Sequence, residues 1–468
     1  MKNIPLITII LSCVGEIKKT ERCLQSICEQ TYPSLELIFI GDIEKEQLEE
    51  FRKDIPALRN VSMVHCQIEE LPQFINGSFV TFLSTQHFFF PSSIEKLYQA
   101  LYLAETEIVV GTFCEFEAGV FYSYWWEEPL LSQVESRQAL MNLDVGDFLI
   151  NRVFASLEGT LLTRELFVQS ATFSTSLSVL AADWLWRFYS KVDKIAFLNQ
   201  VVYAYRRENV VGELVHYTVI LAVEHARLAY LRTVEGYPIE QAYQAYYQRL
   251  ADMSYALNQA GNRQASLGVT RLLIAAEQGI FPYLDLKNPS FTIISNNCWG
   301  GYAYQQLGLE YQTPFVGLFI LPEDYYKLTK NLAYYMEQDL VFDDQLAYFD
   351  KNGHFYPVGH LADVTLHFLH YPSKEDALEK WHRRKARMDW ENLYFKFDNK
   401  DGATPELLHK IDQLPYQSKI IFVHTPDLQL TSQICRPGSP QDTEVSTEGR
   451  ILDYFDLLSW LNQGGDSL

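Results

Sequence analysis

The chain has 468 residues, which is too long for one ordinary core and predicts two or three domains. Its 38 basic and 59 acidic side chains give a formal net charge of −21, and such a field repels nucleic acid and anionic lipid heads. Nucleic acid is therefore excluded as an expected partner, and an anionic ligand would have to bind through local dipoles or a metal.

Seven cysteines are scattered along the chain, odd in number and without a Cys-x-x-Cys pair, which argues against a disulfide framework and predicts a reduced, cytoplasmic protein. The apolar run at residues 4–11 could be mistaken for a signal peptide. However, Lys2 is the only basic residue before it, and Glu16 and Lys18 follow at once, so a buried strand is expected. No other run approaches the roughly 18 apolar residues that a membrane span needs.

Apolar, β-branched runs alternate with helical patterns through the first part of the chain. Strands are expected at residues 6–12, 36–40, 61–65, 79–83 and 108–113, and helices at residues 18–30, 43–53 and 92–104. This alternation is typical of an α/β fold with a mostly parallel sheet and helices on both faces. Ligands of such sheets bind at the carboxyl ends of the strands.

The pattern changes after residue 211. Residues 212–280 lack strand runs, and Ala, Leu, Tyr and Gln recur at helical spacing, which predicts several packed helices. Residues 281–290 contain two prolines and are expected to form a linker, and a second α/β unit is expected to start with a strand at residues 291–295. We therefore expect three parts, at residues 1–211, 212–287 and 288–468.

Six segments of the first part occur in the order that is found in one family of enzymes. They are residues 5–12, 22–33, 35–42, 77–83, 180–183 and 203–209. They resemble the opening, the strand before the Asp-x-Asp motif, the Glu-Asp motif and the closing Tyr-x-Tyr-Arg segment of family 2 glycosyltransferases with the GT-A fold. The resemblance implies transfer of a sugar from a UDP-sugar donor. Together with the resemblance of the C-terminal part described below, it leads to the expectation that the acceptor is a bacterial surface glycan or glycoprotein.

The resemblance places the donor near Asp42 and the residues that follow the fourth strand, Ser84, Gln86 and His87, with Asp183 as the candidate catalytic base. The chain departs from the family because Ser-Thr-Gln stands where Asp-x-Asp is expected, and hard divalent cations prefer anionic oxygens. A divalent metal is therefore doubtful. Asp42 serves an Asx turn equally well, and Asp183 could instead be a helix N-cap before Trp184.

Two explanations of this departure stay open. The domain binds its donor without metal, with Arg206, Arg207 or Arg152 holding the diphosphate. Alternatively, it is a retired transferase that is kept as a scaffold or as an acceptor-binding module.

The C-terminal part begins with residues 291–301, whose sequence is typical of a strand, a glycine turn and a helix. The N–H groups at such a helix start can hold an anion. The segments at residues 313–320, 367–371, 381–384 and 396–402 follow. Residues 288–435 resemble a bacterial domain family of unknown function found in exopolysaccharide and capsule biosynthesis loci. This resemblance implies a role connected with polysaccharide biosynthesis, but it implies no particular reaction.

Candidate catalytic residues in this part are Cys298 and His367. Further candidates for a site are Asn297, Trp299, Gly300, His370, Arg384, Lys396, Asp398 and Asp401. Several have a structural alternative: the cysteine and tryptophan could belong to the core, Arg384 to a solvated helix face, and the two aspartates to a capped turn. The spacing of His367 and His370 would suit a metal on a helix, but their context is that of a strand, so no metal site is expected.

Three functions are consistent with the sequence. The first is transfer of a sugar by the N-terminal part. The second is glycosyl or acyl transfer in the C-terminal part beside a retired N-terminal module. The third is a non-enzymatic scaffold for glycan assembly.

Overall fold

The structure is a computed structural model, which describes residues 4–13, 17–41, 43, 45–117, 119–123, 127, 129–143, 153–172, 180–206, 217–343, 348–349, 352–436, 444–447 and 449–467. The chain forms two compact units, Met1–Arg249 and Leu250–Leu468, and the boundary falls inside one continuous helix, α10 (Ile239–Gln259). The α/β class predicted from the sequence is confirmed. None of the described helices is long and apolar enough to cross a bilayer.

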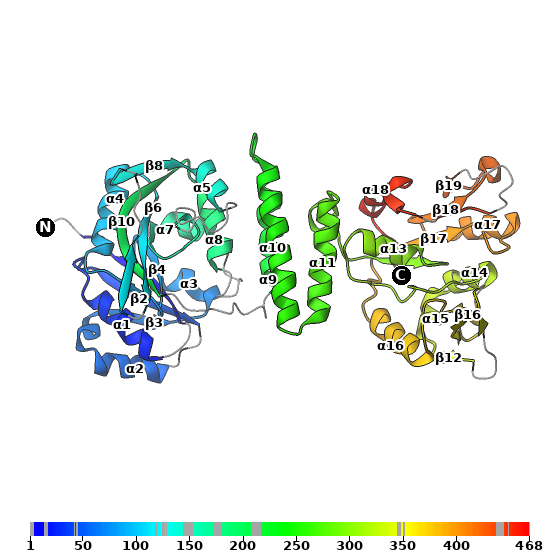
Figure 1. The fold of residues 1–468 in the computed structure, drawn as a ribbon, viewed down its shortest axis with the longest axis horizontal. Helices are drawn as coiled ribbons and strands as arrows, with labels where there is room; N and C mark the ends of the chain where they lie inside the picture. Colours follow the sequence, from blue (N-terminus) through cyan, green and yellow to red (C-terminus); the bar gives the residue numbers. More distant parts are fainter. Residues whose placement is uncertain are drawn as a thin grey trace. The chain divides into compact units, whose positions relative to one another are not determined.

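The N-terminal unit is built on one mixed sheet, for which the described residues give ten strands (Figure 1). The strands are β1 (Ile7–Cys13), β2 (Leu35–Gly41), β3 (Ser62–His65), β4 (Phe79–Ser84), β5 (Phe88–Phe89), β6 (Ile108–Glu117), β7 (Val120–Ser123), β8 (Leu131–Glu135), β9 (Thr160–Thr163) and β10 (Lys194–Arg206). Their order is β3-β2-β1-β4-β9-β6-β10-β5, with β7 paired to β6 and β8 paired to β10.

The first four strands in this order pair in parallel, as the strand–helix alternation predicts. The sheet becomes mixed beyond β4, because β9 runs antiparallel to both β4 and β6. Residues along β1 and β2 are buried on both faces, which explains why their sequences are continuous apolar runs.

Helices pack on this sheet from several parts of the sequence. They are α1 (Ile17–Cys28), α2 (Lys45–Asp54), α3 (Leu71–Phe74), α4 (Ser93–Ala104), α5 (Ser136–Asn142), α7 (Arg164–Ser170) and α8 (Leu180–Tyr189). Helix α4 packs against β6, β8, β9 and β10, whereas α7 packs against β4 and β9. These contacts hold β4 and β10, the two strands that lead into the predicted donor site.

A buried carboxylate ties together the amino-terminal ends of three strands. Glu36 of β2 is 4% exposed and accepts hydrogen bonds from Thr8 Oγ1 (2.5 Å) and Gly77 N (3.0 Å). Asn76 N donates to the same carboxylate at 2.8 Å. This arrangement brings the turn before β4 against β1, so that a side chain at Gly77 would have no room.

We expect Gly77→Ala to destabilise the N-terminal unit by about 1–3 kcal/mol, the usual range for overpacking. A Cβ atom at Gly77 would lie 2.6 Å from the backbone nitrogen of Thr8, which cannot move aside without distorting β1. Urea unfolding measures the change. The control is Gly268→Ala in α11 (Arg263–Glu277), where a Cβ atom would meet open space and helix propensity predicts a gain of up to about 1 kcal/mol. Equal stability of the two variants would contradict the close approach at Gly77.

Helices predicted between residues 212 and 280 are confirmed as α9 (Tyr217–Leu231), α10 and α11. Within the N-terminal unit, α9 and α10 are joined by a buried ion-pair network. Glu224 lies 3.2 Å from Arg227 and 2.9 Å from Arg249. The short helix α12 (Pro282–Asp285) lies within the segment expected to be a linker.

The C-terminal unit contains a parallel sheet in the order β11-β17-β18-β19, formed by Thr292–Ser295, Leu393–Asp398, Lys419–Val423 and Gln433–Cys435. A smaller antiparallel sheet, β12-β15-β16, is formed by Leu340–Phe342, Val358–Leu361 and Val364–His367, and β13 (Tyr348–Phe349) pairs with β14 (Phe355–Tyr356). The helices are α13 (Trp299–Gln306), α14 (Pro322–Lys330), α15 (Leu332–Glu337), α16 (Lys374–Lys385), α17 (Pro405–Asp412) and α18 (Leu457–Asn462).

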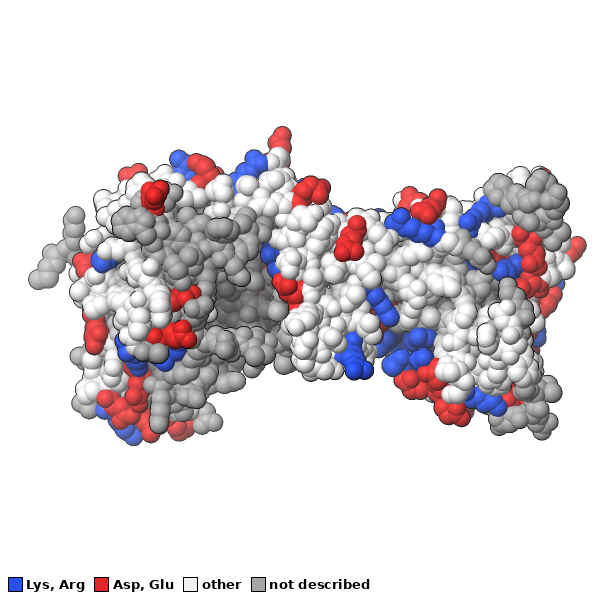
Figure 2. All heavy atoms as spheres, viewed as in Figure 1, with Lys and Arg blue, Asp and Glu red and all other residues white. Residues whose placement is uncertain are grey.

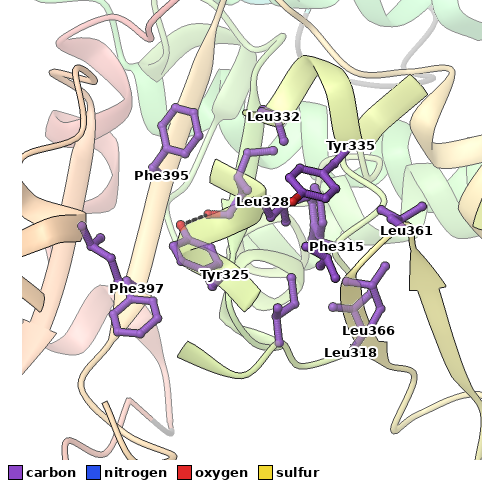
Figure 3. Packing of buried hydrophobic residues seen from close by; sticks show 14 of the residues in the cluster. Phe315, Leu318, Tyr325, Leu328, Leu332, Tyr335, Leu361, Leu366, Phe395 and Phe397 are labelled. Atoms are coloured by element: carbon purple, nitrogen blue, oxygen red, sulfur yellow. Dashed lines mark hydrogen bonds between the residues drawn. The ribbon is translucent and has the colours of Figure 1, made fainter. Parts of the chain in front are cut away.

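One apolar core joins the two sheets of this unit (Figure 3). Phe395 and Phe397 of β17, Tyr325 and Leu328 of α14, and Leu366 of β16 all belong to it. The hydroxyl group of Tyr325 donates to the carbonyl of Ile294 at 3.0 Å, so the core also fixes the end of β11. The core thereby holds the carboxyl ends of β11 and β17, where the candidate residues of this unit lie.

Candidate functional site

The loop predicted to replace the Asp-x-Asp motif begins at the end of a central strand. Ser84 is the last residue of β4, and the register pairs it with Ser12 of β1, which in turn pairs with Ile40 of β2. The loop therefore starts at the carboxyl ends of the first parallel strands. Asp42, Arg152 and Arg207 lie outside the described residues.

A carboxylate that the sequence analysis missed lies beside this loop. Glu158 Oε1 is 3.1 Å from Nδ1 of His87, and Ser156 Oγ donates to Glu158 Oε2 at 2.7 Å. Burial by itself would raise the pKa of Glu158, but the hydrogen bonds and charge of His87 and the bond from Ser156 outweigh it and lower the pKa to about 2. No local motif marks Glu158, which reaches the loop through a bridge to Phe82 of β4.

The residues around Ser84 do not suit a hard divalent cation. Ser84 and Gln86 offer neutral oxygens, and the nearby carboxylate of Glu158 is already engaged by His87 and Ser156. Within the described residues, no three His, Cys, Asp or Glu side chains are placed to share a metal ion.

Asp183 lies in the first turn of α8 and is 2% exposed. Arg187 Nε donates to its carboxylate at 2.8 Å, and the hydroxyl group of Thr172 donates as well. Because α8 begins at Leu180, the alternative that Asp183 is an N-cap before Trp184 is wrong. The base role of Asp183 stays a prediction, as does donor binding by Arg206, which ends β10 with its guanidinium 5.6 Å from the ring centre of Phe116.

The C-terminal candidates converge at one edge of the parallel sheet. Asn297 follows β11, and Lys396 and Asp398 end β17, which runs parallel beside it. Nζ of Lys396 lies 2.7 Å from Asp398 Oδ1 and donates to Asn297 Oδ1 at 2.9 Å. The amide nitrogen of Asn297 donates to Asp398 Oδ2 at 2.5 Å, and Thr447 Oγ1 donates to the same oxygen at 2.7 Å. Lys396 and Asp398 are fully buried, so these contacts hold the amide group of Asn297 in one orientation.

Two cavities open at this edge. The larger, of about 620 Å³, is lined by Asn297, Trp299 and Asp401, among others. The smaller, of about 250 Å³, is lined by His370 and Arg384. Cys298 lines both. The structure thus gathers sequence candidates that lie more than one hundred residues apart into adjoining cavities.

Three of the residues predicted to form a site in the C-terminal part, Trp299, Gly300 and His367, make packing contacts in the structure. Trp299 is 2% exposed and belongs mainly to the core, where its indole nitrogen donates to Tyr454 Oη at 3.0 Å. A Cβ atom at Gly300 would lie 3.1 Å from Ser295 Cβ, so this glycine allows α13 to approach β11 closely. His367 ends β16, as its strand-like context predicts, and stacks on Phe319 with ring centres 4.4 Å apart.

Burial dominates the electrostatics of this edge. It lowers the pKa of Lys396 to about 8, against the opposing charge of Asp398, and it raises the pKa of Cys298. It also lowers the pKa of His367 and raises that of Asp401. At neutral pH the thiol group of Cys298 is therefore mostly protonated, which makes it a weak nucleophile.

Helix α16 presents a mixed charged surface. Figure 2 shows Lys and Arg side chains gathered over this helix beside acidic ones. Arg383 pairs with Glu379 at 2.9 Å, as expected of a solvated helix face. Arg384 differs, because it is 9% exposed and donates from Nη1 to Tyr371 Oη at 2.6 Å. The charge pattern of the sequence does not show that Arg384 is buried while the neighbouring Arg383 is exposed.

Comparison with known proteins adds family information. Residues 269–462 match a domain of unknown function (DUF1919), in agreement with the predicted resemblance of the C-terminal part. Glycosyltransferase GlyG of Streptococcus pneumoniae is 24% identical over 216 residues, covering 44% of this chain and 71% of GlyG. Glycosyltransferase GlyA of the same species is 24% identical over 281 residues, covering 54% of this chain and 38% of GlyA. The chain is thus similar to glycosyltransferases.

Among solved structures, Staphylococcus aureus TarS 1–349 in complex with UDP is 11% identical and has a TM-score of 0.43, covering 78% of this chain and 98% of that chain. This low score supports no inference about the present chain. A stronger relationship exists with an uncharacterized protein of Haemophilus influenzae, which is 34% identical over 185 residues that cover 38% of this chain and 86% of that protein. At that identity and coverage, the chain belongs to the same family as the Haemophilus influenzae protein.

Proposed function

We propose that this chain is a glycosyltransferase that transfers a sugar from a UDP-sugar to a bacterial surface glycan or glycoprotein. The observation that supports this most directly is the similarity to GlyG, which spans 71% of that glycosyltransferase. The parallel order β3-β2-β1-β4, with the Ser84 loop at its carboxyl edge, supports a donor site at that edge, because ligands of such sheets bind there.

The proposed site works without a divalent cation. His87 is 9% exposed and its Nδ1 faces the carboxylate of Glu158, so the proposal assigns the other ring nitrogen, Nε2, to the ligand. A carboxylate that orients the imidazole through Nδ1 leaves the other ring nitrogen to hydrogen-bond with a phosphate oxygen. In this proposal His87 and Arg206 bind the diphosphate, and Asp183 accepts the proton of the acceptor hydroxyl group.

The test is release of UDP from UDP-glucose, UDP-galactose and UDP-N-acetylglucosamine, measured with and without EDTA. We expect release that EDTA leaves unchanged. Loss of the bond from His87 to the phosphate should raise the KM of His87→Ala about 10- to 100-fold, the equivalent of about 1.5–3 kcal/mol for a hydrogen bond to a charged group. The control is His409→Ala, which removes an exposed histidine of α17.

Two outcomes would overturn the proposal as stated. Activity abolished by EDTA would contradict the cation-free site. Failure of the protein to bind any UDP-sugar would contradict the proposed activity and would favour the hypothesis of a non-enzymatic scaffold. The remaining alternative, transfer in the C-terminal unit by Cys298 and His367, predicts that Cys298→Ser abolishes release while His87→Ala does not. The raised pKa of Cys298 weighs against that alternative.

A further inference from the structure

Arg384 is a buried cation that contacts the ring of Tyr311, 4.8 Å from Cζ, but to which the described residues supply no anion. Its neighbours on α16 form ion pairs, Lys380 with Asp376 at 2.8 Å and Arg383 with Glu379 at 2.9 Å. Across the described part of the chain, no carboxylate lies within ion-pair distance of Arg384, whose one hydrogen bond goes to the neutral hydroxyl group of Tyr371. Burying a guanidinium without an anion is costly, so a ligand that supplies the anion would bind here strongly.

The cavity at Arg384 has the size and charge for one anionic group. Its volume of about 250 Å³ lies below the ~300–1,000 Å³ of sites that enclose a whole small ligand. Lys380 and His370 line it together with Arg384, and none of the described residues that line it carries a carboxylate. In a chain with a net charge of −21, a cavity wall of this kind marks a local preference for an anion.

The adjoining cavity of about 620 Å³ can hold the body of that ligand. Cys298 and Tyr302 line both cavities, so the two meet at the first turn of α13. The larger cavity combines the aromatic ring of Phe319 with the amide groups of Asn297 and Gln306. Amides both donate and accept hydrogen bonds, which suits the hydroxyl groups of a sugar.

The buried pair Lys396–Asp398 prepares one of these amides. Asn297 Oδ1 accepts from Lys396 Nζ and from Trp299 N, and Asn297 Nδ2 donates to Asp398. Lys396 and Asp398 act as positioning residues, because they fix the orientation of Asn297 without lining the cavity themselves. A preorganised amide at the cavity wall is expected of a binding site rather than of a packing defect.

We propose that the C-terminal unit binds an anionic sugar, whose phosphate or carboxylate group pairs with Arg384 in the smaller cavity and whose ring occupies the larger one. This site lies in the other unit from the proposed donor site and does not rest on the proposed function.

The experiment is alkylation of the full-length chain by N-ethylmaleimide, followed at Cys298 by peptide mass spectrometry. A ligand that spans both cavities covers Cys298, whereas the exposed Cys435 serves as an internal reference. The probes are glucose 1-phosphate, glucuronic acid and neutral glucose. Since only the free site reacts, glucose 1-phosphate or glucuronic acid at about ten times its Kd should slow alkylation of Cys298 roughly tenfold, and glucose should not.

Matched variants identify the anion partner. Arg384→Gln should lose the protection, whereas Arg383→Gln on the same helix should keep it. If Arg384→Gln does not fold, Lys380→Gln should weaken the protection by the same probe. Protection by glucose equal to that by the anionic probes, protection retained in Arg384→Gln, or no protection by any probe would overturn the proposal. His87→Ala should leave the protection unchanged, so failure of this site and failure of the donor site are distinguishable.

Discussion

Replacement of Asp398 by asparagine should destabilise the C-terminal unit by about 3–5 kcal/mol, because it removes the partner of a buried charge, which Lys396 must then either lose or carry unpaired. Lys396 is fully buried, and the carboxylate of Asp398 lies 2.7 Å from its Nζ. The remaining hydrogen bond from Nζ, to Asn297 Oδ1, is to a neutral group and does not balance the charge. Burial already lowers the pKa of Lys396 to about 8, so the variant is expected to bury a neutral lysine at pH 7.

Hydrogen–deuterium exchange read by mass spectrometry measures this effect, since it reports opening of the C-terminal unit separately from that of the N-terminal unit. Asp401→Asn is the matched control, because Asp401 lies shortly after β17, is more exposed than Asp398 and takes no part in the ion pair with Lys396. It should change stability by less than about 0.5 kcal/mol. The double variant Lys396→Met, Asp398→Leu should recover most of the loss. A change below about 1 kcal/mol in Asp398→Asn would show that Lys396 does not depend on this carboxylate.

Acidification should remove about 3 kcal/mol of stability from the N-terminal unit through Glu158 alone, since a pKa lowered from 4.5 to about 2 corresponds to roughly 1.4 kcal/mol per unit. The folded state binds a proton at Glu158 less readily than the unfolded chain does. The contribution is therefore fully present above pH 4.5 and is lost as the pH falls towards 2. The hydrogen bonds from His87 and Ser156 are its source, because protonation of Glu158 weakens both.

The measurement is urea unfolding of wild type and Glu158→Gln between pH 6 and pH 3. The difference between the two proteins should shrink as the pH falls, since the variant has no carboxylate to protonate. Glu165→Gln, an exposed position at the start of α7, should follow the wild-type dependence. If Glu158→Gln showed the full wild-type loss of stability on acidification, Glu158 would not be its origin.

Runs of apolar residues in the sequence predicted the buried strands of the N-terminal sheet, but not the strands that tertiary pairing determines. The runs that form β1, β2 and β4 are apolar and buried on both faces, so their positions were predictable to within one or two residues. Strand β8 was missed because Leu131–Glu135 is only half-buried and contains three polar residues, so it shows no apolar run. Strand β9 was missed because its antiparallel place between β4 and β6 is set by tertiary pairing.

The candidate sites likewise combine residues that the sequence predicted with residues that only the tertiary structure reveals. The strand–turn–helix pattern led to Asn297, and the segment at residues 396–402 led to Lys396 and Asp398. Their convergence was not predicted, because it depends on β17 pairing in parallel with β11. Glu158 carries no motif, and its approach to His87 depends on the path of the chain before β9. The sequence also could not show that Arg384 is buried while Arg383 is exposed, since the helix must first be docked.

Strand β10 pairs with β5, β6 and β8, all of which precede it in the chain. Within the described residues, β5 and β8 have no other strand partner. At a synthesis rate of about 5–20 residues per second, a ribosome needs on the order of 10 s to travel from β8 to the end of β10. Throughout that interval the nascent N-terminal unit exposes unpaired strand edges, which are templates for aggregation, so this stretch of translation is where a chaperone would be needed most.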